Sequence, residues 1–168
     1  AKAFAVNLWT RIDPVQFGSN IARARHALKS EPRDKTYHRE FIEYALLDTP
    51  GLSSEAITDI LRGAKPQRPD VANWQILELI NRQKRNAGLT AKLLNLVHFT
   101  FISFRYCRAP VFMDRPACFS TQYHAFCAAL LSDSPHKRHK RIANRATEML
   151  AQLAGTHGFV NLLGRGAG

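Results

Sequence analysis

The sequence predicts an all-α protein, a short α-solenoid of antiparallel helix pairs, and three observations support this prediction. A pattern recurs after thirty-seven residues: Trp74 follows Tyr37, and the Gly-Leu-Thr turn at 88–90 follows the Gly-Leu-Ser turn at 51–53. A fixed period of this size is typical of stacked repeats. Apolar residues recur at intervals of three and four, the spacing of one helix face, and no stretch alternates convincingly as a strand would.

Helix boundaries in the first half follow from caps and breakers. Asp13 and Pro14 combine an N-cap residue with proline at the first helical position. Pro50 and Gly51 stop a later helix, because proline donates no backbone hydrogen bond and glycine accommodates a left-handed turn. Ser53 or Ser54 caps the helix that follows this stop. We therefore expect helices over 13–30, 35–48 and 53–63, followed by a two-proline linker at 65–69.

The second half is also predicted to be helical. Asp70 caps one helix, Thr90 caps a long one, and Ser134 with Pro135 starts the last. Residues 110–116, bounded by prolines, are predicted to form a loop. The expected helices cover 71–86, 90–107, the region around 123–130, and the region from 134 to about 153.

The long helix over 90–107 is apolar on nearly all sides. Such a helix is usually central and covered by neighbours. We therefore predict that Leu94, Val97, Phe101 and Phe104 are among the most buried side chains, and that truncating Phe101 to alanine costs about 3–5 kcal/mol. His98 and His124 are expected to be hydrogen-bonded core residues within otherwise apolar helices.

Composition narrows the classes of partner and of compartment. Lys and Arg number 24 against 13 Asp and Glu, a formal net charge of +11, which favours an anionic partner: nucleic acid, an acidic lipid surface or an acidic protein face. The cysteines Cys107, Cys118 and Cys127 form no C-x-x-C pair, so we expect reduced, buried thiols in a cytosol or a mitochondrial matrix. The longest apolar run, 93–104, is too short for a membrane span.

The recurring unit resembles the pentatricopeptide repeat. That family has units of this length, with an aromatic residue early in the first helix, a glycine before the second and Pro-Asp at the close, as Tyr37, Gly51 and Pro69-Asp70 stand here. The resemblance implies one helical-repeat domain over 1–168. Its units would be 13–33 (partial), 34–70, 71–109 and 117–155, followed by a tail at 156–168.

The best-known activity of this family is to read single-stranded RNA, one base for each repeat, through two side chains. Aligned with the family's pattern, those positions fall on His38 with Asp70, and on Gln75 with a residue near Arg108. His38 and Gln75 differ from the small polar residues that the family generally uses. RNA recognition therefore stays an alternative, together with a place in the mitochondrial ribosome.

A second resemblance concerns size and repeat number. The chain, of 18.9 kDa, is similar to the eighteen-kilodalton accessory subunits of the euglenozoan mitochondrial F1-ATPase, which carry about three such repeats. That resemblance implies a non-catalytic subunit of the mitochondrial ATP synthase on the matrix side, docked on an α subunit of the F1 head. A chain that starts at Ala1 fits a mature mitochondrial protein, and it also fits loss of the initiator methionine.

The densest basic run spans residues 136–141. Its cations are Lys137, Arg138, Lys140 and Arg141, and they lie at a helix start. Positive charges there interact unfavourably with the helix dipole unless an anion pairs with them. They are candidate contacts for an anion or a partner, and the alternative is a solvated helix turn. His136 and His139 have the spacing of a shared metal, but no cysteine or carboxylate of metal-site spacing accompanies them, so no metal is expected.

Catalytic motifs are absent from the sequence. It contains no G-x-x-x-x-G-K-[ST], no H-E-x-x-H, no G-x-S-x-G, and no G-x-G-x-x-G after a strand pattern. We expect neither an enzyme nor a cofactor, and an uncharacterised enzyme ranks behind the two binding functions.

Overall fold

The computed structural model describes residues 1–34, 38–67, 69–85, 88–115 and 118–154. The chain forms two compact units, Ala1–Gln67 and Arg68–Gly168. Their boundary falls in the predicted two-proline linker at 65–69. A single repeat domain over 1–168 stays a prediction, and each unit is described separately below.

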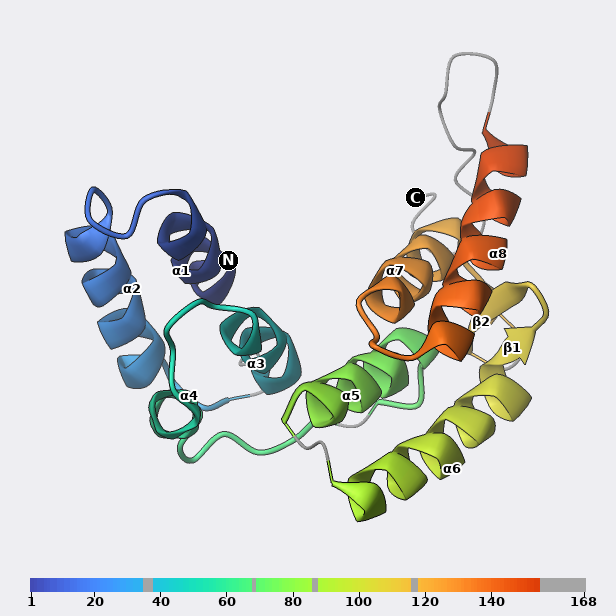
Figure 1. Ribbon diagram of the computed structural model, residues 1–168, viewed down its shortest axis with the longest axis horizontal. Helices are drawn as coiled ribbons and strands as arrows, with labels where there is room; N and C mark the ends of the chain where they lie inside the picture. Colours follow the sequence, from blue (N-terminus) through green and yellow to red (C-terminus); the bar gives the residue numbers. More distant parts are fainter. Residues whose placement is uncertain (35–37, 68, 86–87, 116–117, 155–168) are drawn as a thin grey trace. The chain divides into compact units, whose positions relative to one another are not determined.

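The described residues of the first unit form four helices around a small apolar core, and Figure 1 shows these helices in blue and teal. Helix α1 contacts α2 and α3, and α4 contacts both α2 and α3. Val6, Leu28, Leu46 and Ile60, one from each helix, are almost fully buried in this core. The helices are α1 (Lys2–Ile12), α2 (Gly18–Ser30), α3 (Arg39–Leu47) and α4 (Ser54–Ile60).

Two predicted helix starts in this unit are wrong, and α1 is not among the predicted helices. The Asp13 carboxylate accepts hydrogen bonds from the backbone N–H groups of Val15 and Gln16. It therefore caps a turn after α1, and α2 begins only at Gly18. Likewise α3 begins at Arg39, not at 35, with His38 as its N-cap residue. Capping chemistry identified the turn but not the helix that follows it.

Other local predictions for this unit are confirmed. The Ser53 hydroxyl accepts a hydrogen bond from Ala56 N–H at 3.2 Å and caps α4. Gly51 ends the preceding turn with a φ of 68°, a conformation that side chains with a Cβ rarely adopt. A further contact, not predicted from the sequence, joins the last turns of α2 and α4: Arg33 donates hydrogen bonds to the carbonyls of Leu28 and Ile60.

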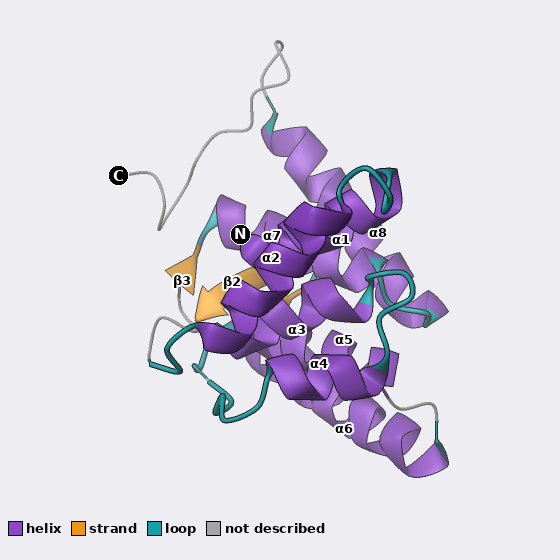
Figure 2. Ribbon diagram, turned by 90° about the vertical axis from the view of Figure 1, so that its left-hand side faces the viewer, coloured by secondary structure: helices purple, strands orange, loops and turns teal. Residues whose placement is uncertain are grey.

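In the second unit, the part of the chain that the structure describes forms four helices and a small antiparallel sheet, whose strands β2 and β3 are orange in Figure 2. Helix α5 contacts α6 and α7, and α7 contacts α8. Strand β2 packs against α5 and α7. The elements are α5 (Ala72–Arg85), α6 (Leu89–Tyr106), β1 (Cys107–Arg108), β2 (Val111–Arg115), β3 (Cys118–Phe119), α7 (Thr121–Ser132) and α8 (Lys137–Leu153).

The expectation of a loop over 110–116 is wrong, because β2 occupies most of it. The strands are ordered β1-β2-β3, with Cys107 opposite Phe112 and Met113 opposite Phe119. Phe112 and Asp114 are buried, whereas Val111 and Met113 are half-buried. A strand of five residues between prolines, with a carboxylate on its buried face, gives too short a pattern to recognise. This sheet counts against an uninterrupted array of helical repeats.

The described residues are thus mostly helical, as predicted for the all-α class. The expected partners α3 and α4, and α5 and α6, contact each other, as do α7 and α8. Tyr37, the first residue of the recurring pattern, lies outside the described residues, as does the tail at 156–168. The solenoid therefore stays a prediction.

Candidate docking surface

Helix α6 buries one face and exposes the other. Asn95, Phe99, Ile102 and Tyr106, spaced by four, three and four residues, are the buried residues of this helix. They fall on one side because each residue turns the helix by about 100°. This side packs against α5, and the Phe99 ring lies 4.0 Å, centroid to centroid, from the His139 ring of α8.

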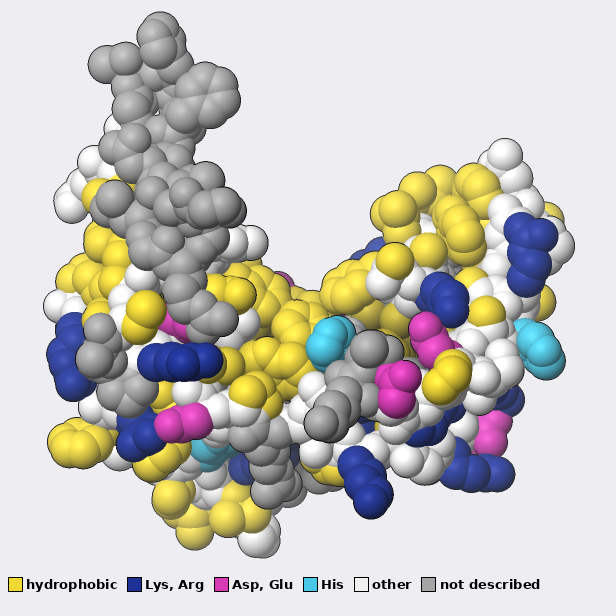
Figure 3. Space-filling model, turned by 180° about the vertical axis from the view of Figure 1, so that it is seen from behind, with side chains coloured by type: hydrophobic (Ala, Val, Ile, Leu, Met, Phe, Trp, Pro, Cys, Tyr) yellow, Lys and Arg dark blue, Asp and Glu magenta, His cyan; other side chains and the backbone are white. Residues whose placement is uncertain are grey.

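The opposite side of α6 is apolar and exposed, which overturns the prediction that it forms the core. Phe104 is 86% exposed, Val97 61%, Leu94 54% and Phe101 49%. The sequence pattern identified a helix with apolar residues on all sides, but only one side is covered. Figure 3 shows hydrophobic side chains gathered along the lower edge of this unit. We call the α6 face the set of Leu89, Leu93, Leu94, Leu96, Val97, Phe101 and Phe104.

The α6 face is bordered by cations, and α6 itself contains no Asp or Glu. Lys92 and Arg105 fall on its two edges by the helix angle. At the C-terminal end, Phe101, Phe104, Arg105 and Arg108 line a shallow pocket. The Arg108 guanidinium donates to the Phe104 carbonyl at 3.3 Å. The surface therefore combines an apolar centre with a basic border.

Asp70, a candidate base-recognition residue, has its side chain hydrogen-bonded within the second unit. Its carboxylate accepts hydrogen bonds from the Arg105 guanidinium, with Nε at 3.1 Å, and from the Tyr106 hydroxyl. The hydrogen bond from Arg105 and then that from Tyr106 lower the pKa of Asp70. Asp70 therefore anchors the C-terminal end of α6 to the start of α5.

The other two candidate readers, His38 and Gln75, are placed differently. Gln75 Oε1 lies 3.1 Å from His98 Nε2, and its amide nitrogen donates to the Pro69 carbonyl at 3.4 Å. His98 is therefore hydrogen-bonded as expected, but it is half-buried and not a core residue. His38 is exposed, with its ring edge-on to Phe41 at 6.2 Å. His38 belongs to the first unit, whereas Asp70 and Gln75 belong to the second.

The predicted basic cluster, defined as Lys137, Arg138, Lys140 and Arg141, occupies the first turns of α8, and all four residues are exposed. The Arg138 guanidinium lies 5.8 Å from the centroid of the Phe99 ring, within the range of a cation–π contact. A hollow beside it is lined by residues of α5, α6 and α8, among them Lys92, Leu96 and Arg138. The basic cluster is therefore continuous with the N-terminal half of the α6 face.

His139 lies beneath this cluster and is only 5% exposed. Its Nδ1 atom is 2.8 Å from the Ser134 hydroxyl, which also lies 2.9 Å from Gln83 Oε1. Burial, followed by the charges of His136 and Arg138, lowers the pKa of His139 to about 4. His139 is therefore a neutral structural residue near pH 7. Burial likewise lowers the pKa of His124.

These shifts predict an acid-labile second unit. An unfolded imidazole binds its proton near pH 6.5, whereas folded His139 binds it only near 4. Between these values the unfolded state holds more protons, so the free energy of unfolding falls as pH decreases. We therefore expect the free energy of unfolding to fall by about 3 kcal/mol between pH 6.5 and pH 4 on account of His139.

Urea unfolding across this pH range measures the loss. His139→Gln keeps a polar side chain without the titration, and it should flatten the pH dependence of the unfolding midpoint. An unchanged slope in this variant would assign the acid lability to other groups.

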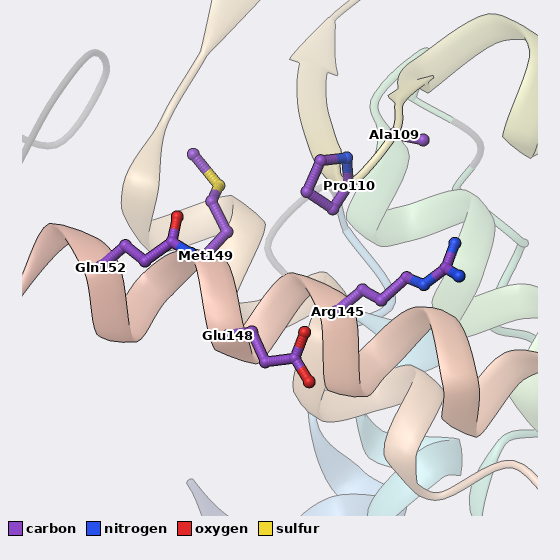
Figure 4. Close-up of a pocket in the computed structure, with 6 residues that line it drawn as sticks. All are labelled: Ala109, Pro110, Arg145, Glu148, Met149 and Gln152. Carbon is purple, nitrogen blue, oxygen red and sulfur yellow. The ribbon is translucent and has the colours of Figure 1, made fainter.

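A further depression lies where the β1–β2 turn meets α8. Figure 4 shows the Pro110 ring above α8, near Met149 and Arg145, with Glu148 and Gln152 on the same helix.

Among the described residues, no group of three His, Cys, Asp or Glu side chains is placed to hold a metal ion. The rings of His136 and His139 are 5.3 Å apart at their centroids, in an edge-on arrangement.

The cysteines and the helix lengths bear on two other predictions. Cys127 is buried, Cys107 and Cys118 are half-buried, and all three are free thiols. Burial raises the pKa of Cys107.

No helix within the described part of the chain is long and apolar enough to cross a bilayer.

A second apolar stripe, which the sequence reading missed, lies on α1. Phe4, Leu8 and Ile12, spaced by four residues, are 48%, 55% and 63% exposed. The signal was present in this spacing, but without a capping residue the helix was not predicted.

Comparisons with known proteins give no relatives. No protein-family model matches the chain, and neither the curated proteins nor the solved structures contain a significant match. The function is therefore argued from the surface itself.

Proposed function

We propose that this chain is a non-catalytic accessory subunit of a larger protein assembly, which it joins through the α6 face. Its expected assembly is the head of the mitochondrial F1-ATPase, with an α subunit as the contact and the matrix as its compartment. The F1 assignment rests on the resemblance in size and repeat class. Docking through α6 rests on one observation: an apolar helix face exposed to solvent along its whole length.

An exposed face of this kind is unfavourable unless a partner covers it. Monomeric proteins rarely expose contiguous apolar patches beyond a few hundred Å². Stable protein interfaces place apolar and aromatic side chains at the centre and charges at the rim. Val97, Phe101 and Phe104 would be that centre, with Lys92 and Arg108 at the rim.

RNA binding is the alternative, and one observation favours it. Phe101 and Phe104 line a pocket together with Arg105 and Arg108, and aromatic rings beside arginines are typical of single-strand binding surfaces. Five of the seven residues of the α6 face are aliphatic, however, and cannot stack on bases as aromatic rings do. Asp70 and Gln75, the expected base readers, are engaged by Arg105 and His98. Protein docking therefore accounts for more of the surface.

Capture of the purified F1 head, and separately of single-stranded RNA, across a salt series tests this function. The α6 variant, Val97→Glu with Phe104→Glu, should weaken capture of F1 by more than about tenfold, because it places charges in the buried centre. Val15→Glu is the matched control, since Val15 is 90% exposed and lies outside this face. It should leave capture unchanged.

Reversing the four cations of the basic cluster to glutamate separates the two functions. Docking on protein should survive the reversal and high salt, with slower association only. RNA affinity would instead fall by about one log unit per log unit of salt for each phosphate contact, and the reversal would abolish it if those cations make the contacts. Nanomolar, salt-sensitive RNA binding by the native chain, or F1 capture that ignores the α6 variant, would contradict the proposal.

A further inference from the structure

The exposed side of α6 carries an uncharged row of apolar residues, which we call the α6 seam. It consists of Leu94, Val97, Phe101 and Phe104, which follow each other by three, four and three residues and are all at least about half exposed. Apolar residues at alternating intervals of three and four are typical of a helix that packs against another helix. With 18 residues, α6 is about 27 Å long, so the seam runs along more than half of its length.

The cations near α6 contribute little charge to the seam. By the helix angle, Lys92 and the hollow that it shares with Arg138 lie on the opposite side of α6. The Asp70 carboxylate pairs with Arg105 at the C-terminal end. Arg108 remains at that end, where it lines the shallow pocket beside the seam. A partner therefore has to match the seam chiefly by its apolar shape.

A second copy of α6, placed antiparallel, has the matching shape. When the contact is centred between Val97 and Phe101, Phe101 of each copy faces Val97 of the other, and Phe104 of each copy faces Leu94 of the other. Each aromatic ring then meets a smaller aliphatic side chain, an alternation that fills a helix interface without voids. A parallel pair would instead bring each phenylalanine against its own equivalent. The seam is thus complementary to itself, as a two-fold interface requires.

The antiparallel arrangement also separates the remaining charges. The two Arg108 side chains would lie at opposite ends of the helix pair, roughly 27 Å apart, which is about three Debye lengths at physiological salt. Each would meet the N-terminal end of the other helix, where Leu89 and Thr90 carry no charge. Their mutual repulsion is therefore largely screened.

The exposed apolar area is sufficient for a weak, specific dimer. Together with Leu93, which is 62% exposed, the seam presents on the order of 500 Å² of apolar surface. Two copies would cover roughly 1,000 Å², the lower limit of a specific interface. An interface of this size favours a dissociation constant of about 10–100 μM.

We infer that the chain on its own forms a two-fold dimer in which the α6 seams of two copies pack antiparallel. The dimer covers the surface that the proposed docking function also uses, so the two contacts exclude each other. Self-association would cover the apolar face of the free chain at high concentration, and docking would require its release. This goes beyond the proposed function, because it does not depend on which assembly captures the chain.

Two other occupants fit these observations less well. An acidic helix would find little beside the seam except Arg108 to attract its carboxylates. An anionic lipid surface attracts an apolar stripe that basic side chains flank on both sides. Here Lys92 and Arg138 lie on the side of α6 opposite the seam, so these cations could not reach the headgroups while the seam is inserted.

Sedimentation equilibrium of the full chain over a concentration series tests the inference. The native chain should dimerise with a dissociation constant of about 10–100 μM. The α6 variant should weaken the dimer by at least about tenfold, because its carboxylates enter the apolar centre. Val15→Glu is the matched control and should leave the dissociation constant unchanged. Circular dichroism verifies that each variant remains helical.

A pair of complementary variants tests the antiparallel register. Val97→Glu and Phe101→Lys should each weaken self-association, because each homodimer would place two like charges in the apolar centre. Mixed in equal amounts, the two variants should associate at least about tenfold more tightly than either does alone. The reason is that the carboxylate introduced in one copy faces the ammonium group introduced in the other.

Several outcomes would overturn the inference. They are a native chain that stays monomeric up to about 1 mM, a dimer that the α6 variant leaves intact, and a mixture that associates no more tightly than its components. A monomeric chain whose α6 variant loses binding to vesicles of anionic phospholipid would assign the face to a lipid surface. Loss of binding to a helical peptide with glutamate edges would assign it to an acidic helix.

The dimer and the proposed docking fail separately. If the chain is monomeric but the α6 variant loses F1 capture, docking stands and the second copy is wrong. If the dimer forms through the seam but F1 capture ignores the α6 variant, the dimer stands and docking through α6 is wrong.

Discussion

Truncation of Phe99 to alanine is expected to lower the free energy of unfolding by about 3–5 kcal/mol. Phe99 is 0% exposed, and its ring is tilted against that of His139, with the ring centroids 4.0 Å apart. Its removal leaves a cavity between α6 and α8, and the Arg138 cation loses the ring beneath it. The cost combines lost apolar burial with incomplete relaxation around the cavity.

Phe104→Ala is the matched control on the same helix. Phe104 is 86% exposed, so its truncation should change stability by less than about 0.5 kcal/mol. Phe101→Ala should lie between the two, below the 3–5 kcal/mol that the sequence predicted, because Phe101 is 49% exposed. Urea unfolding monitored by circular dichroism measures all three. Equal losses at Phe99 and Phe104 would mean that the exposed face is covered in solution.

His124→Leu is expected to cost about 2–3 kcal/mol, because it removes a buried acceptor. Phe112 N–H donates to His124 Nδ1 at 2.9 Å, so the ring proton is on Nε2, which donates to the Ala146 carbonyl at 3.0 Å. One imidazole therefore joins β2, α7 and α8. Leucine has a similar volume but leaves the Phe112 N–H without this acceptor.

His26→Leu is the control for this change, since His26 is exposed in the first unit. It should shift the unfolding midpoint only within about 0.5 kcal/mol. A near-neutral His124→Leu would show that the N–H finds another acceptor, and that the β2–α8 connection depends on apolar packing. Guanidinium unfolding at neutral pH measures the difference without protonation of the ring.

Local chemistry made several elements predictable from the sequence. Ser53 caps α4, the prolines at 66 and 69 fall at the boundary between the units, and the helix pairs α5–α6 and α7–α8 follow their apolar spacing. His124 is the hydrogen-bonded core histidine that its apolar surroundings predicted. Each of these signals lies within a few residues of its effect, so no tertiary information is needed.

The sequence by itself determined the helical class, the positive charge and the basic cluster at the start of α8, since these follow from composition and short-range spacing. Only the tertiary structure decided which side of α6 is buried. A helix apolar all round has no preferred face, and the choice depends on where α5 and α8 lie. The same holds for β2, whose five residues become a strand because partners β1 and β3 satisfy its backbone. The candidate docking surface is what packing left uncovered, and no local pattern could reveal it.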